Sequence, residues 1–340
     1  MDRSLIRPEP TRRAVLVGAA AGAAVLFAGR FAHAADSSVK LASSLPAGTP
    51  WATHFQRLAA DVTRRSKGAV TLELALGGVE GDELSALRAC RAGKLAFWAG
   101  TVDAAARLVP ALGALALPDL FRDTKTADKA IDGARDDLNA LLGAADLELA
   151  FVSDLGEHCL AGNFGYVSGA ADLQGRSLAV LPGELAVETA KALGATPVAL
   201  PMEEIGGALS NALTDGVDAP PLLASAFGWT DAVTHITLSA HRAAPLLVVA
   251  SKKALAELPE GTRAVLRFDA DAEARAGRKA ARAAAAALTR GFKKAGLFAR
   301  APAKAERAAL CDGAQGVQER FLTLAGDAGR TLLTRLRGAS

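Results

Sequence analysis

Apolar and polar positions along the chain follow two periods, one typical of strands and one typical of helices. Between residues 70 and 76, valine and leucine stand at every second position, which predicts a half-buried strand. Between residues 55 and 62, apolar residues stand three and four apart, which predicts a helix with one buried stripe that begins after Thr49 as N-cap, with Pro50 in its first turn. The same patterns predict strands at 39–42, 95–99, 147–152, 177–181, 198–200, 217–219 and 244–250, helices at 82–92, 184–193 and 202–213, a helix from 124 to about 141, and a long helix at 262–294.

Strands and helices alternate in this pattern. Such an order is typical of open, mainly parallel sheets that are covered by helices on both faces. The chain has 340 residues, of which 51% are hydrophobic. Residues 35–340, which follow the N-terminal segment, exceed what one hydrophobic core usually supports. The sequence therefore predicts an α/β fold of two lobes with a ligand cleft between them.

The N-terminal segment has the features of an export signal. Arg12 and Arg13 precede a 16-residue uncharged run at 14–29, and a small-x-small site ends at Ala34. The run is weakly hydrophobic and shorter than the roughly 20 residues that span a bilayer. Paired arginines before such a weak core are typical of a twin-arginine signal. We expect residues 1–34 to be removed after about Ala34, which leaves a periplasmic protein; an uncleaved N-terminal anchor is the alternative.

The charge of the chain argues against a nucleic-acid partner. Residues 1–34 hold five arginines and two acids, so the formal net charge of +3 lies in that segment and residues 35–340 are neutral. A neutral body with 5% aromatic residues lacks the basic surface of a nucleic-acid-binding protein. The cysteines, Cys90, Cys159 and Cys311, are widely spaced and are expected to be small buried hydrophobic residues, with at most one disulfide as the alternative. No cysteine lies near the cleavage site, so a lipid anchor is not expected.

Sequence signatures of catalysis are missing from the chain. The histidines at 54, 158, 235 and 241 have no metal-ligand spacing, and no nucleophile elbow, P-loop or dinucleotide-binding motif occurs. The acidic pairs 203–204 and 269/271 stand at helical spacing that is typical of a solvated face. We expect no metal and no cofactor. A serine, histidine and aspartate brought together from distant positions stays open as an alternative, because spacing does not show geometry.

Seven motifs stand in the order and spacing of one family. They are SLPAGTPW at 44–51, GVEGDE at 78–83, LPDLFRD at 117–123, ADLQG at 171–175, LGATPV at 193–198, GVDA at 216–219, and SKK followed by LP between 251 and 259. In these motifs the chain resembles the DctP-type solute-binding proteins of tripartite ATP-independent periplasmic (TRAP) transporters. The resemblance implies two α/β lobes joined by crossing strands and a long helix, a small-molecule solute, and membrane permease subunits as partners. It places residues 35–154 and about 244–280 in the first lobe, and 155–243 and about 281–340 in the second.

Two positions depart from the family pattern. Ala179 stands where the family usually has an arginine in its hinge strand, and His158 stands where a second arginine is common. A guanidinium suits the two oxygens of a carboxylate, so its replacement predicts a mainly apolar or amphipathic solute. The segment 218–224, with Trp229, resembles the branch of the family that acts with an additional periplasmic tetratricopeptide-repeat protein.

The carboxyl ends of the predicted strands select the ligand-binding candidates, because ligands of open α/β sheets bind there. They are Ser44, Trp51, Trp98, Gly100, Leu181, Glu184, Pro220 and Pro221, together with Ala179 and His158 from the family comparison. Core packing for each tryptophan and a structural hydrogen bond for His158 are the alternatives. The function predicted for the chain is capture of a solute for a permease. A ligand sensor without transport and an exported enzyme are the competing classes.

Overall fold

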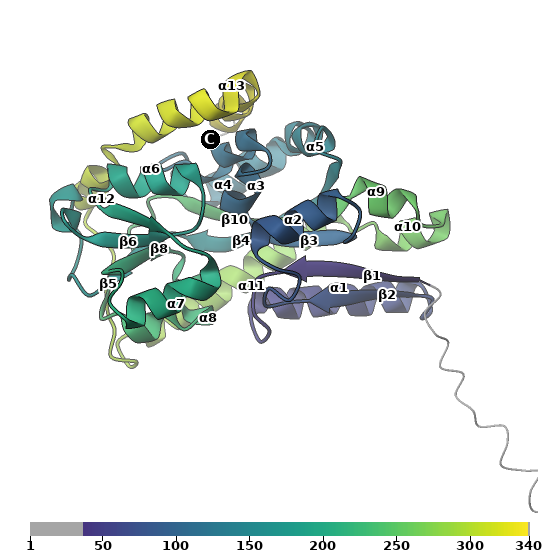
Figure 1. Ribbon diagram of the computed structural model, residues 1–340, viewed down its shortest axis with the longest axis horizontal. Helices are drawn as coiled ribbons and strands as arrows, with labels where there is room; N and C mark the ends of the chain where they lie inside the picture. The colour runs from purple at the N-terminus through teal and green to yellow at the C-terminus, as the bar shows by residue number, and fades with distance from the viewer. Residues whose placement is uncertain (1–36, 339–340) are drawn as a thin grey trace, which may run out of the picture.

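The computed structural model describes residues 37–338, so the predicted signal segment at 1–34 lies outside the described residues. Figure 1 shows two groups of strands, each flanked by helices, side by side along the long axis of the molecule. The described residues form a five-stranded and a six-stranded sheet. This arrangement confirms the predicted two-lobed α/β fold. None of the helices between residues 37 and 338 combines the length and the apolar composition needed to cross a membrane.

The first lobe is built on the five-stranded sheet. Its strands in spatial order are β2 (Val70–Ala75), β1 (Ser37–Ser43), β3 (Phe97–Thr101), β10 (Ala243–Ser251) and β4 (Leu147–Glu157). Its helices are α1 (Pro50–Arg65), α2 (Glu83–Arg91), α3 (Val102–Ala106), the 3₁₀ helix η1 (Pro110–Ala116), α4 (Thr124–Gly133), α5 (Arg135–Gly143), α9 (Lys252–Ala256) and α10 (Glu260–Leu266). Consecutive residues of β1 are buried on opposite faces of the sheet: Leu41 belongs to the core beneath α1, and Ala42 belongs to the core beneath α2.

The second lobe is built on the six-stranded sheet. Its strands in spatial order are β11 (Phe298–Arg300), β9 (His235–Thr237), β5 (Cys159–Gly162), β8 (Gly216–Ala219), β6 (Ser177–Val180) and β7 (Thr196–Ala199). Its helices are α6 (Glu184–Ala192), α7 (Met202–Ser210), α8 (Pro221–Ala226), α12 (Lys304–Cys311) and the 3₁₀ helices η2 (Ala170–Leu173) and η3 (Trp229–Ala232). Both sheets are mixed: β10 runs antiparallel to β3 and β4, and β5 runs antiparallel to β8 and β9. The other strand pairs are parallel, as expected, and the antiparallel pairs involve β10 and β5, which the chain enters as it crosses between the lobes.

Two predicted helices are interrupted. The helix expected at 262–294 is α10 followed by α11 (Ala270–Gly291), which begins after Asp269 as N-cap. The break lets the ring of Phe268 lie 5.4 Å from that of Phe97 and 6.3 Å from that of Phe151, measured between centroids. The helix expected from Thr124 is α4 followed by α5, divided at Ala134. The break before α11 thus buries Phe268 against distant residues, which the local period does not report.

The C-terminal helix lies over the first lobe. Helix α13 (Ala314–Gly338) runs across the top of the molecule in Figure 1, and it contacts η1, α4 and α6. Phe321 and Leu333 belong to the same apolar core as Leu112 and Ile131 of the first lobe. Gly326 has a φ of 57° and interrupts the helix. Residues 281–340 were expected in the second lobe, and α13 contacts η1 and α4 of the first lobe as well as α6 of the second; the division into lobes by residue number stays a prediction.

Candidate functional site

The chain crosses between the sheets at two adjacent segments. Strand β4 ends at Glu157 and β5 begins at Cys159, so His158 is the one residue between them. The chain returns through residues 238–242, between β9 and β10. The main-chain N–H of His158 donates to the carbonyl of Arg242 at 3.0 Å, and the N–H of Ala240 donates to the carbonyl of His158 at 3.0 Å. The two segments therefore form one hydrogen-bonded hinge, which we define as His158 with residues 238–242.

A buried arginine links this hinge to both lobes. The Arg242 side chain is 0% exposed and donates two hydrogen bonds to Asp103, at 3.0 and 3.3 Å. Its Nε lies 3.7 Å from Oδ2 of Asp218. Asp103 belongs to α3 of the first lobe and Asp218 to β8 of the second. Burial opposes the guanidinium charge, but attraction to the two carboxylates outweighs it and raises the pKa of Arg242.

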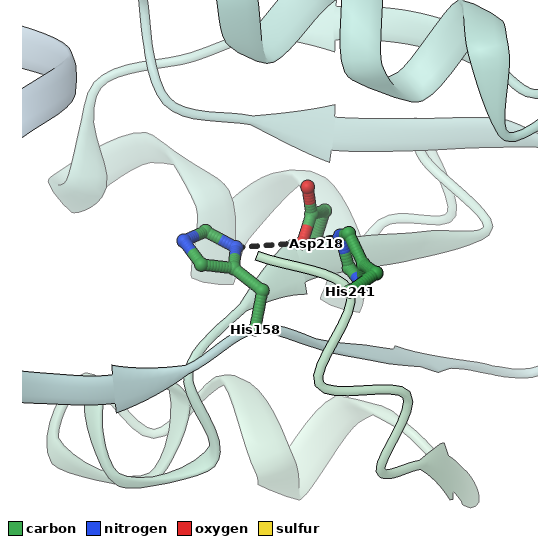
Figure 2. Close-up of side chains that lie close together, drawn as sticks. All are labelled: His158, Asp218 and His241. Carbon is green, nitrogen blue, oxygen red and sulfur yellow. Dashed lines mark hydrogen bonds and ion pairs between the residues drawn. The ribbon is translucent and has the colours of Figure 1, made fainter. Parts of the chain in front are cut away.

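Two histidines complete the buried network around Asp218 (Figure 2). Nδ1 of His158 lies 2.7 Å from Oδ1 of Asp218, and Nε2 of His241 lies 3.3 Å from the same oxygen. The Ser239 hydroxyl lies 2.7 Å from Nδ1 of His241. Burial alone would raise the pKa of Asp218, but its neighbours His158, His241 and Arg242 outweigh burial and hold that pKa well below its usual range. Burial, together with the charge of Arg242, lowers the pKa of His158.

The chemistry of this cluster is also that of metal ligands. His158, Asp218 and His241 place one ligand atom each within 4.8 Å of one another, although no sequence spacing predicted it. The distance of 2.7 Å between His158 and Asp218 is, however, that of a hydrogen bond. Two ligands of a tetrahedral ion stand about 3.3 Å apart, because each lies about 2.0–2.1 Å from the metal. Since Arg242 already supplies positive charge, the geometry favours a proton-bearing network around one carboxylate.

Three cavities lie between the lobes beside this network. The deepest, whose lining residues are all buried, has a volume of about 10 Å³. A second cavity, of about 360 Å³, opens between α2 and α7, and a third, of about 620 Å³, lies between α3, α6 and α13. Asp103 lines the deepest and the third cavity, and Arg107 lines the second and the third. Because neighbouring cavities share lining residues, we define all three together as the interlobe cleft.

Half of the predicted ligand-binding residues line the interlobe cleft. Leu181 lines both the deepest and the second cavity. The others are Ser44 in the second cavity, His158 and Pro220 in the deepest, and Glu184 in the third. Glu184 also forms an ion pair with Arg320 of α13. These positions support the placement of the cleft at strand ends, while the binding role of each residue stays a prediction.

The other predicted residues are not among those that line the interlobe cleft. Trp51 is buried and donates from Nε1 to the Asp154 carbonyl at 2.8 Å. Trp98 is 0% exposed, and a Cβ added to Gly100 would lie 2.1 Å from its ring. Ala179 lies on β6 in the core, and half-buried Pro221 begins α8. We expect these residues to support the cleft walls through packing.

A half-buried carboxyl group lies in the second cavity. Glu83 accepts hydrogen bonds from the N–H of Thr101 at 2.9 Å and from its hydroxyl at 2.8 Å. Loss of hydration raises the pKa of Glu83 to about 7 in spite of these bonds. Glu203 and Glu204 face the same cavity from the first turn of α7 and are exposed, as their helical spacing predicted.

Sequence reasoning missed two arginines, Arg242 in the hinge and Arg107 in the cleft. Arg242 follows a histidine in a short polar segment between two apolar strands, and that position was the only local signal for it. Arg107 follows α3, is exposed, and lines the cleft opening. The cysteines are unpaired: Cys90 and Cys159 are buried as expected, whereas Cys311 is half-buried.

Comparison with known proteins assigns the family. The model of the DctP family, bacterial extracellular solute-binding proteins of family 7, matches residues 41–323. The chain belongs to this family. Among curated proteins of similar sequence, the 2,3-diketo-L-gulonate-binding periplasmic protein YiaO of Escherichia coli K12 is 27% identical over 189 residues, which are 55% of this chain and 58% of that protein. The uncharacterized protein y4mM of Sinorhizobium fredii is 26% identical over 209 residues, or 61% of this chain and 39% of that protein. The chain thus matches 58% and 39% of the lengths of these two relatives.

Solved structures of TRAP solute-binding and sugar-acid-binding proteins share the fold. A TRAP periplasmic solute-binding protein of Roseobacter denitrificans with bound β-D-glucuronate has a TM-score of 0.82, at 20% identity over 88% of this chain and 99% of that one. The sugar-acid-binding protein of Advenella mimigardefordensis with galactonate has a TM-score of 0.83, at 22% identity over 89% and 98%. A protein of Ralstonia eutropha H16 with bound (S)-2-acetolactate has a TM-score of 0.81, at 23% identity over 89% and 98%. At these identities the likeness shows the fold alone.

Proposed function

We propose that the chain is the periplasmic receptor of a TRAP-type transporter, which closes its lobes on a small organic solute and delivers it to a membrane permease. Membership of family 7 and the interlobe cleft beside a hydrogen-bonded hinge support this role. The role requires binding and no reaction of the solute. Export through the twin-arginine route and cleavage after about Ala34, without a lipid anchor, belong to the same proposal. The tetratricopeptide-repeat partner rests on the sequence resemblance at 218–224.

We propose an apolar or amphipathic solute. The observation that carries this choice is the pairing of Arg242 with Asp103, because Asp103 lines the deepest cavity and the nearby guanidinium is already occupied by its carboxylate. A solute carboxylate buried there would lose its hydration without a free counter-charge, which costs several kcal/mol. Apolar residues face the third cavity; they include Ala106, Leu185, Val187, Phe321 and Leu324. An apolar chain of the solute fits this wall.

A hydroxylated acid is the second candidate. Arg107 is exposed at the opening of the cleft, where its charge helps to lower the pKa of Asp82 in the same cavity. Relatives named above are described with sugar acids, 2,3-diketo-L-gulonate, glucuronate and galactonate among them. A solute of this class would keep its carboxylate at the opening beside Arg107 and direct its hydroxyl groups inward.

Native mass spectrometry of the gently purified protein, followed by calorimetry, tests the proposal. We expect a retained small molecule, micromolar binding within a panel of longer-chain acids and apolar metabolites, and weak binding of succinate. Arg107→Gln is the informative variant: it weakens binding of hydroxylated acids such as D-glucuronate and leaves apolar metabolites unaffected. Micromolar binding of succinate without a response to apolar compounds would overturn the apolar assignment.

Small-angle scattering tests the receptor role separately. A ligand shifts an open–closed equilibrium by its differential affinity for the closed state. We therefore expect a smaller radius of gyration when the retained solute is present at saturation. An unchanged scattering profile with a bound solute would contradict closure of the lobes and favour a rigid binding protein or an enzyme.

A further inference from the structure

The proton on His158 has a position fixed by its partner. Nδ1 lies 2.7 Å from Oδ1 of Asp218, and both side chains are almost completely buried, with exposures of 2% and 0%. A carboxylate accepts hydrogen bonds and does not donate them. Asp218 is ionised, because Arg242 lies beside it and its pKa is held low. The hydrogen of the contact therefore belongs to Nδ1 of His158.

The second ring nitrogen of His158 is consequently a hydrogen-bond acceptor. A neutral imidazole carries one proton, so a proton on Nδ1 leaves a lone pair on Nε2. The ring stays neutral because it is buried near the positive charge of Arg242, and these two effects lower its pKa. In Figure 2 the nitrogen that is not bonded to Asp218 points away from the carboxylate. Among residues 37–338, no side chain donates a hydrogen bond to it.

The space beside this ring is small and has few polar groups. His158 lines the deepest cavity of the interlobe cleft, whose volume of about 10 Å³ accommodates about one water-sized group. Leu155, Leu181 and Pro220 supply apolar walls. Asp103 faces the same cavity, but Arg242 holds its two oxygens. A solute carboxylate in this cavity would place two more acceptor oxygens beside Nε2 of His158 and the carboxylate of Asp103. Neither of these groups has a proton to donate to it.

We propose that His158 selects the solute by presenting an obligatory hydrogen-bond acceptor at the deep end of the interlobe cleft, so that the buried end of the solute carries a hydroxyl or neutral N–H donor. Asp218 is the positioning residue, because it fixes the ring and its tautomer. This inference rests on the proposed receptor function and narrows its solute class to amphipathic molecules with a donor at the leading end. A carboxylate of such a solute stays at the opening of the cleft.

The first experiment reads the tautomer directly. Long-range ¹H–¹⁵N correlation spectra of the ¹⁵N-labelled protein at pH 7.5 distinguish the two neutral tautomers and the imidazolium. His158→Gln identifies the signal by its disappearance, and His235→Gln, at a half-buried position of β9 outside the interlobe cleft, serves as the matched control. We expect the Nδ1–H tautomer with an unprotonated Nε2. An Nε2–H tautomer or an imidazolium at this pH overturns the inference.

The second experiment reads the selectivity with three probes of similar size. Hexan-1-ol offers a donor, 1-methoxypentane offers only an acceptor, and hexanoate offers a charged acceptor. We expect the alcohol to bind the wild-type protein at least about tenfold more tightly than the ether, as one hydrogen bond predicts, and to shift the Nε2 resonance. In His158→Gln the preference for the alcohol over the ether is expected to fall to about twofold or less, because the glutamine amide both donates and accepts hydrogen bonds. Equal binding of alcohol and ether, tighter binding of hexanoate at this nitrogen, or no response to the alcohol at saturation overturns the inference.

The variants and readouts separate this inference from the proposed function. A retained solute that closes the lobes but lacks a donor group contradicts the role of His158 and leaves the receptor function intact. Failure of every solute to change the scattering profile contradicts the receptor function, whereas the tautomer spectrum needs no solute. Asp218→Asn supplies an independent check, because an amide can donate to Nδ1 and move the ring proton to Nε2. We expect this variant, where it folds, to bind the ether at least as well as the alcohol; an unchanged alcohol preference contradicts the positioning role.

Discussion

Arg242 in the hinge and Asp103 in the first lobe form a doubly hydrogen-bonded ion pair in the interior of the protein. Each oxygen of the Asp103 carboxylate accepts from a different nitrogen of the guanidinium, which fixes both the distance and the orientation of the two groups. The pair joins residues 139 positions apart. It therefore ties the segment that connects the lobes to the helix at the floor of the cleft.

Removal of one partner of this pair is expected to destabilise the protein strongly. Arg242→Ala leaves Asp103 and Asp218 without their shared cation, which predicts a loss of about 3–5 kcal/mol in the free energy of unfolding. Arg64→Ala is the control, because Arg64 pairs with Asp61 on the exposed surface and such pairs contribute little. Urea unfolding followed by circular dichroism measures both variants. Equal effects of the two substitutions would show that the buried pair is dispensable.

Glu83 is expected to make stability depend on pH. Its pKa of about 7 in the folded protein lies above its ordinary value of 4.5, so between these values the folded state binds the proton that the unfolded state releases. Stability relative to Glu83→Gln therefore falls as pH rises from about 4.5 to 7, by about 2–3 kcal/mol, and changes little above pH 7. Unfolding of both proteins at pH 5 and pH 8 measures the effect. Parallel pH profiles would contradict the raised pKa.

Gly100 is expected to tolerate no side chain. A Cβ at this position would lie 2.1 Å from the Trp98 ring, so Gly100→Ala must displace the indole or the strand and is expected to cost at least about 2 kcal/mol. Gly207→Ala is the control, since a Cβ there meets nothing within 4 Å and alanine favours the helix by up to about 1 kcal/mol. Thermal unfolding distinguishes the two. A stable Gly100→Ala protein with unchanged tryptophan fluorescence would contradict the described packing.

Helix α13 is expected to contribute to the first lobe's stability. Phe321 is 0% exposed and lies in the core beside η1, so Phe321→Ala is expected to cost about 3–5 kcal/mol. Thr323→Ala, at an exposed position of the same helix, is the control and is expected to change stability by less than about 0.5 kcal/mol. A small effect of Phe321→Ala would show that α13 is loosely attached.

The paired arginines of the N-terminal segment are expected to direct export. Arg12 and Arg13 precede a weakly hydrophobic run, which is typical of the twin-arginine route. Replacement of both by lysine is expected to leave unprocessed precursor in the cytoplasm, detected by fractionation and immunoblotting. Normal periplasmic yield of the processed protein after this change would exclude the twin-arginine route.

Local patterns predicted the strands and helices whose defining contacts lie close in sequence. Alternating leucines predicted β2, and Thr49 predicted the start of α1, where its hydroxyl accepts from the N–H of Ala52. The break before α11 was not predictable in this way. Phe268 leaves the helix because Phe97 and Phe151 receive its ring, and they stand more than 100 residues earlier in the chain. A helical period carries no information about such contacts.

The site was predictable in its position and not in its chemistry. Strand ends predicted the cleft, and His158 was found because it replaces an arginine of the family motif. The residues that determine its chemistry, Asp218 and Arg242, come from different strands and connections, and only the crossing of the lobes brings them to His158. Trp51 and Trp98 followed the expected strand ends, but their large rings pack into the core.

The main-chain hydrogen bond between His158 and Arg242 has an evolutionary consequence. His158, which we propose binds the solute, is joined by this bond to Arg242, which pairs with Asp103. The main chain of one residue therefore cannot move without the other. A substitution that adapts His158 or Arg242 to a new solute therefore also disturbs the hinge between the lobes. Natural variation in the solute that this binding protein accepts is therefore expected to arise at the opening of the cleft, where Arg107 and the acidic residues of α7 can change one at a time.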